Sequence, residues 1–320
     1  MDFELNQDQH AIVEAVDRLL DQRAGAARAI ELARDNDYDA VLHKELDEAG
    51  FCQIARDLAS GGKLAGLEAA LIVEAVARSA GIVAAGAQLL VAPAVSEVPV
   101  AGPIALCTDR ELAAGTPIRY AAHARHLLVL TDEEAVLVAL QDQDMMPVQT
   151  SFGYPMGRLH NTQRTAELCD VGESLGRVSH TLQNWWRLSL AVEAVGTMEA
   201  ALNHTVSYLK QRRQFGRTIG SFQAVQHRLA QCAIQLEASR WLAREAAYHN
   251  AGAEATATAA AFALHAADQL FTETHQLSGA IGFTREFDLH VWSMRLLGLR
   301  QELNGVGGAR RALVEARWST

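Results

Sequence analysis

Apolar residues recur every three or four positions through the first part of the chain. The repeat is carried by Leu5, Ile12, Val16, Leu19 and Leu20, and again by Leu42, Leu46 and Ala49 before Gly50 interrupts it. The run LEAALIVEAVARSAG at residues 67–81 continues the pattern, with Glu74 on an apolar helix. An apolar face that repeats at this spacing is typical of helices packed on a core. We therefore predict a helical N-terminal domain over residues 1–97.

The pattern changes to that of strands and turns between residues 98 and 177. Three of the six prolines cluster at Pro93, Pro99 and Pro103, where the helical pattern ends. Beyond them, PIALCT, HLLVLT and AVLVAL are short aliphatic runs, and TDEEA separates the last two as a hairpin turn would. The run MMPVQTSFGYPMG has the composition of a loop. We predict a small β domain over residues 98–177.

From residue 178 to residue 320 the pattern is helical again and richer in alanine. Long helical runs cover residues 188–213, 222–252 and 254–279, and a fourth begins at residue 289. Long helices joined by short glycine-containing turns favour an antiparallel four-helix bundle. The predicted fold class is therefore α+β and mostly α, in the order helical domain, β domain, helical bundle.

Charge and composition narrow the function classes. The net charge is −10, which argues against nucleic acid or an anionic membrane as the main partner. No stretch approaches the roughly 20 apolar residues of a membrane span, and the first residues carry acids in place of an apolar signal core. The four cysteines lie far apart without a metal-binding spacing, so we expect free buried thiols and no metal site. The sequence predicts a soluble, cytoplasmic protein.

The segment QRRQFGRTIGSFQAVQHRLAQ, which begins at Gln211, combines the features of an anion site. A long helix should end at its start, Phe215–Gly216 should break the chain, and Ser221 should cap the next helix. Arg212 and Arg213 at the break would have free guanidinium groups, and the new helix would offer unpaired backbone N–H groups. Both features suit a phosphate or a pyrophosphate.

Aromatic and amide side chains in the same segment would complete such a site. Phe215 and Phe222 supply flat apolar faces, while Gln214 and Gln223 supply hydrogen bonds. The alternative is an exposed basic turn between two helices of the bundle, because arginine-rich turns of this kind are common.

A second segment, HQLSGAIGFTRE, follows a long alanine-rich helix. Gly279 and Gly282 would allow the backbone to approach a ligand closely. Glycines that end a helix are the simpler explanation for this segment taken by itself.

Together the two segments indicate a family. The chain resembles the acyl-CoA dehydrogenases over most of its length, beginning with F-x-L-x-x-x-Q at Phe3–Gln9. The most specific matches are R-x-Q-F-G-R-x-I-x-x-F-Q-A-V-Q-H at Arg212–His227 and Q-x-x-G-x-x-G-F-T-x-E at Gln276–Glu286. The resemblance implies that FAD lies between subunits, where these C-terminal motifs hold the ADP half of the FAD seated on the neighbouring subunit.

Carried over by position, the resemblance places Arg212 against the pyrophosphate, with Gln214, Phe215 and Gln223 beside the ADP half. The second contact would be a backbone cradle formed by Gln276, Leu277, Ser278, Gly279 and Ala280. Ala280 stands where the family usually has a second glycine, so a methyl group must be accommodated there.

The catalytic base of the family has no clear counterpart. In the family's reaction a glutamate removes the α-proton of the acyl-CoA while the flavin accepts the β-hydride. Read without gaps, the segment that carries this glutamate falls on QELN at residues 301–304, with Leu303 at the glutamate position. A one-residue slip would make Glu302 the base.

Relatives with a relocated base carry it on the first long bundle helix, just before an arginine. This chain has Trp186 before Arg187 at that place, and the indole of tryptophan cannot take the proton. Glu193, in the same helix, is best explained as part of a polar helix face.

The middle domain also departs from the family pattern. The family's flavin-facing segment, of the type T-E-P-x-x-G-S-D, has no equivalent between Pro103 and Thr150, where CTDRELAAGTP is the nearest run. The β domain is also shorter than is usual in the family. We therefore expect no catalytic residue in this chain, and a larger partner subunit that seats the flavin ring and the thioester.

In this respect the chain is similar to the small subunits of the α2β2 acyl-CoA dehydrogenases with which actinobacteria degrade cholesterol and other steroids. The resemblance implies α,β-desaturation of a bulky, steroid-derived acyl-CoA, with one FAD for each pair of unlike subunits. This chain would complete the FAD site of the larger catalytic subunit. Two alternatives stay open: an autonomous homomeric dehydrogenase that uses Glu302, and a flavin-free structural partner subunit.

Overall fold

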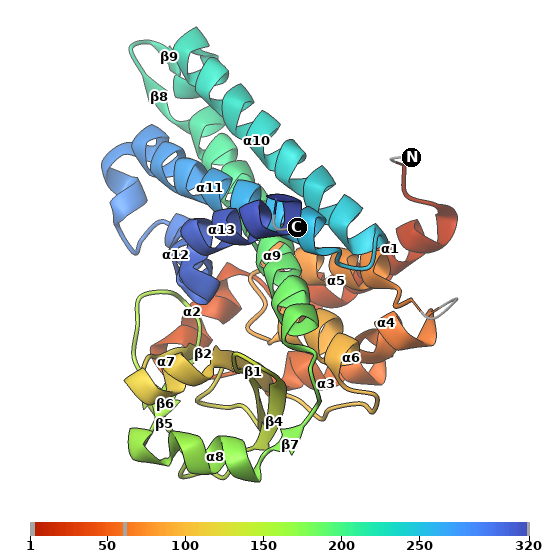
Figure 1. The fold of residues 1–320 in the computed structure, drawn as a ribbon. Helices are drawn as coiled ribbons and strands as arrows, with labels where there is room; N and C mark the ends of the chain where they lie inside the picture. Colours follow the sequence, from red (N-terminus) through yellow and green to blue (C-terminus); the bar gives the residue numbers. More distant parts are fainter. Residues whose placement is uncertain (1–3, 60–62, 319–320) are drawn as a thin grey trace.

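A computed structural model describes residues 4–59 and 63–318. Phe3, the first residue of the N-terminal family motif, lies outside the described residues. Helices at both ends of the sequence pack together, and the strands form a separate layer beneath them (Figure 1). The predicted fold class, mostly helical with a small β part in the middle of the chain, is confirmed.

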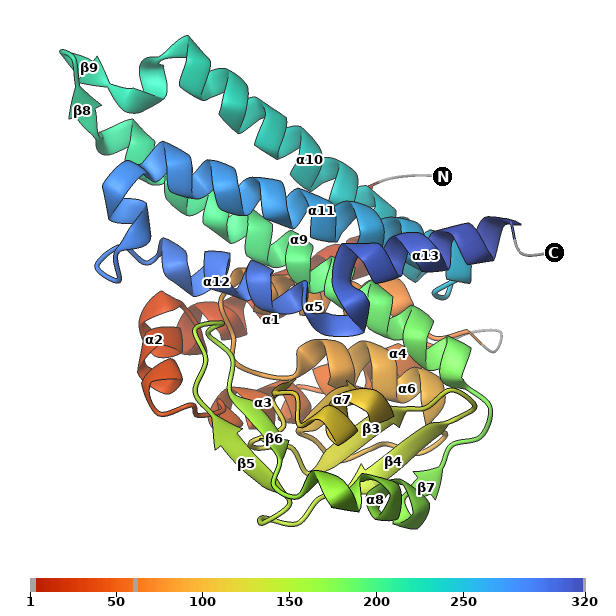
Figure 2. The same cartoon turned by 60° about the vertical axis from the view of Figure 1, so that its left-hand side comes forward.

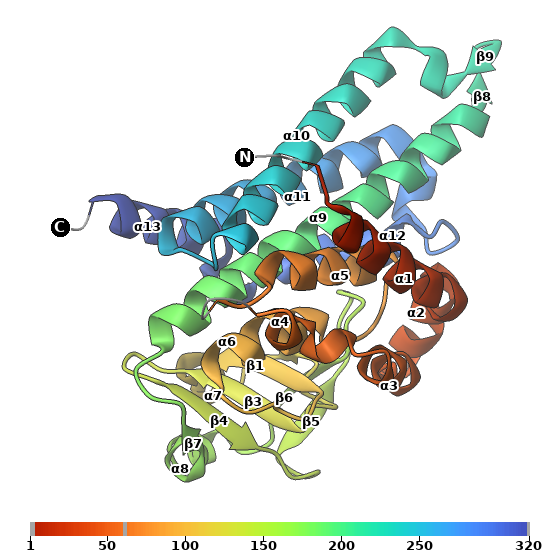
Figure 3. The ribbon, with the colours of Figure 1, turned by 90° about the vertical axis from the view of Figure 1, so that its right-hand side faces the viewer.

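The N-terminal part consists of several helices, one of which is largely buried. Its elements are α1 (Gln7–Arg23), α2 (Ala26–Arg34), α3 (Ala40–Glu48), α4 (Ile54–Asp57), α5 (Gly66–Arg78), a π-helix at Gly86–Val91 and α6 (Ala92–Val95). Asn6 and Gln9 form a capping box at the start of α1, which satisfies backbone N–H groups that the helix leaves unpaired. The predicted apolar helix is α5, and it packs along the first bundle helix (Figure 3).

Glu74 shows how α5 is held against the bundle. Its carboxylate is 7% exposed and lies 2.8 Å from Nε of Arg240 and 3.4 Å from Nη2 of Arg244. A buried carboxylate without such partners would be costly. The acidic residue in an apolar helix is therefore explained by ion pairs with a helix some 166 residues later in the chain.

The strands form two small sheets. One has the order β1 (Ile104–Thr108), β3 (His126–Leu130), β4 (Ala135–Ala139), β7 (Glu173–Ser174), and the other β2 (Ile118–Arg119), β6 (Met156–Leu159), β5 (Met145–Val148). The three predicted strands and the β3–β4 hairpin are confirmed. The prediction of a loop over residues 145–157 is wrong at both ends, because β5 and β6 pair there as antiparallel strands.

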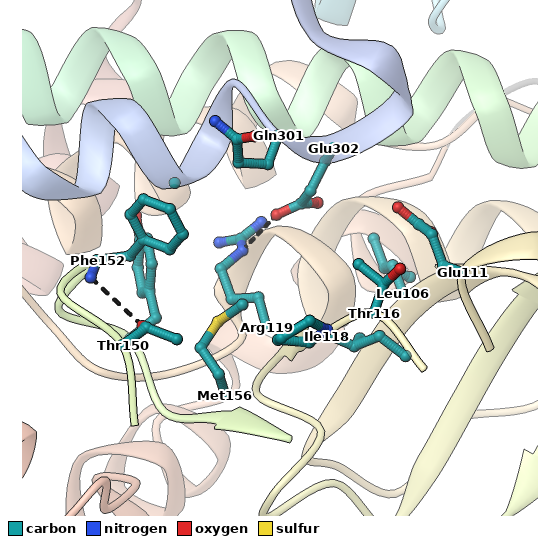
Figure 4. Close-up of a pocket in the computed structure, with 13 residues that line it drawn as sticks. Leu106, Glu111, Thr116, Ile118, Arg119, Thr150, Phe152, Met156, Gln301 and Glu302 are labelled. Carbon is teal, nitrogen blue, oxygen red and sulfur yellow. Dashed lines mark hydrogen bonds and ion pairs between the residues drawn. The ribbon is translucent and has the colours of Figure 1, made fainter. Parts of the chain in front are cut away.

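The C-terminal part is a bundle of long helices. They are α9 (Ser179–Gln211), α10 (Gln223–Tyr248), α11 (Ala253–Ser278), α12 (Leu289–Leu299) and α13 (Gly305–Trp318). The predicted fourth helix is in fact two helices, because Leu303 and Asn304 adopt left-handed backbone conformations with φ of 48° and 62°. This break projects the side chain of Glu302 toward the β layer (Figure 4).

All four cysteines are free; three are buried and Cys169 is half-buried. Within the described residues, no helix has both the length and the apolar character that a membrane span requires. Across residues 4–59 and 63–318, no group of three or more His, Cys, Asp and Glu side chains is placed to hold a metal ion.

Candidate functional site

The basic segment forms a hairpin that projects from one end of the bundle (Figure 2). Helix α9 ends at Gln211, as predicted, and the short strands β8 (Arg213–Gln214) and β9 (Arg217–Thr218) follow. Phe215 and Gly216 make the turn with φ of 53° and 79°, the left-handed geometry of a two-residue hairpin. The predicted break at Phe215–Gly216 is therefore confirmed.

Polar side chains on this hairpin are free to bind something outside the chain. Arg212, Arg213, Gln214 and Gln223 are all exposed, and within the described part of the chain their side chains have no hydrogen-bond partner. Ser221 does not cap α10, because its hydroxyl donates to the Thr218 carbonyl. Helix α10 thus begins at Gln223 without a side-chain cap, and the backbone N–H groups of its first two residues stay available for an anion.

Two aromatic rings, those of Phe215 and Phe222, pack against each other at the hairpin. Phe215 is 88% exposed, and its ring meets that of Phe222 edge to face, with centroids 6.2 Å apart. The guanidinium of Arg217 lies 3.9 Å from the centroid of the Phe222 ring. Sequence reasoning assigned no role to Arg217, although it stands in the quoted motif. A phenylalanine this exposed at a hairpin tip is typical of a surface that another chain covers.

The second predicted segment lies at the same end of the bundle (Figure 2). An ion pair of 2.6 Å between Arg228 and Glu273 joins the first part of α10 to the last part of α11. Gln276 is exposed, and the Ser278 hydroxyl is buried without a hydrogen-bond partner. Leu277 is half-buried, while Gly279 and Ala280 are exposed.

The two glycines of this segment have local explanations. Gly279 ends α11 with φ of 67°, a conformation in which an L side chain is strained. A Cβ on Gly282 would lie 3.0 Å from the Ser278 Cβ and 3.2 Å from the His275 carbonyl oxygen. Gly282 therefore permits close packing within the chain, while the space beside Gly279 is open.

The free donors at this end of the bundle fit the anionic, hydrogen-bonding half of a dinucleotide. Exposed arginines and glutamines of the hairpin, Gln276 near the end of α11 and the uncapped start of α10 all lie at this end of the bundle (Figure 2). Guanidinium groups and helix N-termini are the protein groups best suited to a pyrophosphate.

The other candidate region is a cavity of about 220 Å³ between the β layer and the α12–α13 break (Figure 4). Two segments singled out from the sequence meet there. Glu111, Thr116 and Pro117 come from the run CTDRELAAGTP, and Gln301 and Glu302 come from the run QELN. The other walls are mainly apolar and include Leu106, Ile118, Phe152, Tyr154 and Met156.

A buried ion cluster closes one side of this cavity. Arg119 on β2 donates to Glu193 on α9 with two guanidinium nitrogens, and its Nε lies 2.6 Å from Oε1 of Glu302. Trp186 Nε1 donates to the second oxygen of Glu302 at 2.6 Å. Side-chain exposure is 10% for Arg119, 9% for Glu193 and 14% for Glu302. We call Arg119, Glu193, Glu302 and Trp186 the Arg119 cluster.

Burial and neighbouring charges shift the pKa values of Arg119 and Glu193. Burial opposes the charge of Arg119, but the two carboxylates raise its pKa well above the ordinary value. Burial also raises the pKa of Glu193, and Arg119 offsets part of that shift. The Arg119 guanidinium lies 5.2 Å from the Tyr120 ring centroid and 5.0 Å from that of Tyr154. Arg119 is therefore a fixed cation.

The positions that the resemblance assigns to the catalytic base are engaged in other contacts. Both oxygens of Glu302 accept hydrogen bonds, and Trp186 is fully buried. Leu303 lies in the backbone break and is half-buried. The interpretation of Glu193 as part of a polar helix face is wrong, because the side chain is buried and paired with Arg119. Sequence patterns gave no signal for this pair, whose partners are 74 residues apart.

Known proteins match this chain in sequence and in fold. A sequence model of the acyl-CoA dehydrogenase C-terminal domain matches residues 176–316. The chain is 30% identical to acyl-CoA dehydrogenase IpdE2 of Mycobacterium tuberculosis over an alignment of 325 positions, which covers 98% of each protein.

Solved structures agree with these sequence matches at the level of the fold. A chain of the ChsE4–ChsE5 complex from Mycobacterium tuberculosis superposes with a TM-score of 0.81 at 21% identity, over 100% of both chains. A variant of the Tcur3481–Tcur3483 steroid ACAD gives a TM-score of 0.78 at 23% identity, over 97% of each chain.

Proposed function

Because this chain belongs to the acyl-CoA dehydrogenase family, we propose that it is one subunit of a heteromeric, FAD-dependent acyl-CoA dehydrogenase. It would donate the ADP-side half of the FAD site to a larger catalytic subunit. FAD, when bound, supplies the acceptor for the electrons removed from the acyl-CoA. This chain's own part is to bind the pyrophosphate and the adenosine through the hairpin and the end of α11.

The proposal rests on a contrast between the hairpin end of the bundle and the cavity. At the end of the bundle, Arg212 and its neighbours are exposed and unpaired, as a half-site that faces another chain requires. At the cavity, by comparison, the groups that would face a flavin ring or a thioester are already bound to one another. A homomeric enzyme must present both halves on every chain. This chain presents one.

The comparisons support the proposal of a heteromeric enzyme and suggest the class of its substrate. The ChsE4–ChsE5 and Tcur3481–Tcur3483 structures are complexes of two different named proteins, and the second is named as a steroid ACAD. By this likeness we propose an α2β2 assembly that desaturates a bulky, steroid-derived acyl-CoA of the kind formed in cholesterol degradation. The acyl chain would be held mainly by the catalytic partner.

Expression without and with the partner tests the subunit role. Produced alone, this chain is expected to retain no FAD and to show no acyl-CoA dehydrogenase activity, because it seats no flavin ring of its own. Produced together with the larger subunit, it should copurify with one FAD for each pair of chains. Flavin absorbance and dye-coupled oxidation of acyl-CoA measure both. A yellow, active protein from this chain alone would establish the homomeric alternative.

Replacing Glu302 with glutamine tests whether it is the base. In the complex we expect turnover to stay within about threefold of wild type, since removal of an acid–base group typically costs 10²–10⁴-fold. Steady-state kinetics give the result. Glu111→Gln is the matched control, because Glu111 lines the same cavity and is not a candidate base. A loss near a thousandfold for Glu302→Gln alone would assign the base to this chain.

A further inference from the structure

The cavity beside the Arg119 cluster is too small for a flavin ring and a thioester together. Its volume is about 220 Å³, whereas ligand and cofactor pockets typically hold roughly 300–1,000 Å³. Behind the Arg119 cluster, between β1, the π-helix and α9, a second void has only about 10 Å³. A void of that size is at the lower limit for a single water molecule. Arg119 lies between the two spaces and lines both.

The Arg119 cluster joins three parts of the chain that are distant in sequence. Arg119 comes from β2, Glu193 and Trp186 from α9, and Glu302 from the α12–α13 break. The break is held in left-handed conformations at Leu303 and Asn304, which cost energy for residues other than glycine. Contacts from Arg119 and Trp186 to the adjacent Glu302 fix this strained turn over the cavity.

Stability alone does not account for such a cluster. Burying two carboxylates and a guanidinium costs desolvation energy that the mutual attraction only partly returns, and apolar side chains of similar volume often serve as well. Here all three nitrogens of the guanidinium donate to carboxylates of the chain itself, Nη1 and Nη2 to Glu193 and Nε to Glu302. The arrangement resembles a binding site whose ligand is part of the protein.

We infer that Arg119 is a built-in occupant of this chain's own cavity: its guanidinium fills a cation site formed by Glu193 and by Glu302, which Trp186 holds in place, and so excludes a flavin ring and a thioester from this subunit. The inference rests on the proposed function, and it gives the reason why FAD would be seated on the partner alone. It also predicts that an Arg119 variant carries an empty site for a small planar cation.

Chemical rescue of Arg119→Ala by guanidinium tests this inference. In the purified full chain, Arg119→Ala should lower the Tm by roughly 5–15 °C, because two buried carboxylates lose their counter-ion. Guanidinium chloride at low millimolar concentration should restore part of that loss, because a ligand that binds the folded state alone stabilises it. Sodium chloride at the same concentration should not, and wild type should not respond to either salt.

A triple variant serves as the matched control. Arg119→Ala combined with Glu193→Gln and Glu302→Gln removes the cation and both carboxylates, so guanidinium is expected to give no more stabilisation than sodium chloride. Equal rescue of the triple variant would overturn the inference, as would an Arg119→Ala protein that guanidinium does not stabilise. Thermal melts followed by tryptophan fluorescence provide the Tm values.

If Arg119→Ala yields no folded protein, Arg119→Lys carries the test. Lysine keeps the charge but lacks the planar fork that binds Glu193 with two nitrogens while reaching Glu302 with a third. Its Tm should therefore lie clearly below that of wild type. A lysine variant as stable as wild type would show that the charge alone matters, and would contradict a site shaped for guanidinium.

The rescue is measured without flavin, substrate or partner, so it fails independently of the proposed function. Absence of rescue, together with loss of FAD from an Arg212→Ala complex, would overturn the built-in occupant and leave the donated half-site standing. Rescue, together with undiminished FAD in that complex, would overturn the donated half-site instead.

Discussion

Alanine in place of Arg212 is expected to weaken FAD binding by the complex by roughly 10- to 150-fold, the equivalent of one or two hydrogen bonds to a charged group. The reason is that the Arg212 side chain is exposed and unpaired among the described residues, so its loss removes a ligand contact without breaking contacts inside the subunit. The subunit itself should keep its Tm. Equilibrium dialysis or fluorescence titration of the deflavinated complex with FAD gives the dissociation constant.

Arg213→Ala is the matched control for that experiment. Arg213 is the next residue of the same hairpin and equally exposed. Because successive residues of an extended chain face opposite sides, its side chain should face away from the ligand that Arg212 binds. We expect a change of less than about threefold, from the loss of long-range charge alone. Similar FAD affinity for Arg212→Ala and wild type would favour the flavin-free structural subunit.

Alanine in place of Gly196 is expected to destabilise the fold strongly. Helices α5 and α9 approach so closely at Gly196 that an added Cβ would lie 2.1 Å from the Glu74 carbonyl oxygen and 2.9 Å from the Arg78 backbone nitrogen. Both are backbone atoms within a helix, so neither can move aside easily. Overpacking of this kind costs about 1–3 kcal/mol or more, which should lower the Tm by roughly 4–10 °C.

Gly252→Ala provides the comparison within the same bundle. Gly252 precedes α11 with φ of −56°, and a Cβ there would meet no atom within 4 Å. The free energy of unfolding should change by less than about 1 kcal/mol, the order of a changed N-cap residue. Thermal or urea unfolding of both variants measures the difference. Equal stability for Gly196→Ala and Gly252→Ala would show that α5 and α9 can separate without cost.

Much of the fold could be predicted from the sequence because its long helices carry strong periodic patterns. The end of α9 at Gln211 and the break at Phe215–Gly216 follow from residues that are neighbours in sequence. Strands β5 and β6 could not be predicted, because their pairing partners, not their own composition, make them strands. The split of the last helix at Leu303 could not be predicted either, because leucine rarely adopts the left-handed conformation that it has here.

The sequence by itself determined the family and the two segments proposed to hold the ADP half of FAD. Those segments are short and continuous, so their chemistry can be read from adjacent residues such as Arg212 and Gln214. Only the tertiary structure shows that the charged residues beside the cavity are paired with one another. Arg119 meets Glu193 and Glu302 across 74 and 183 residues of chain, and a buried charge has no pattern until the fold places its partner beside it.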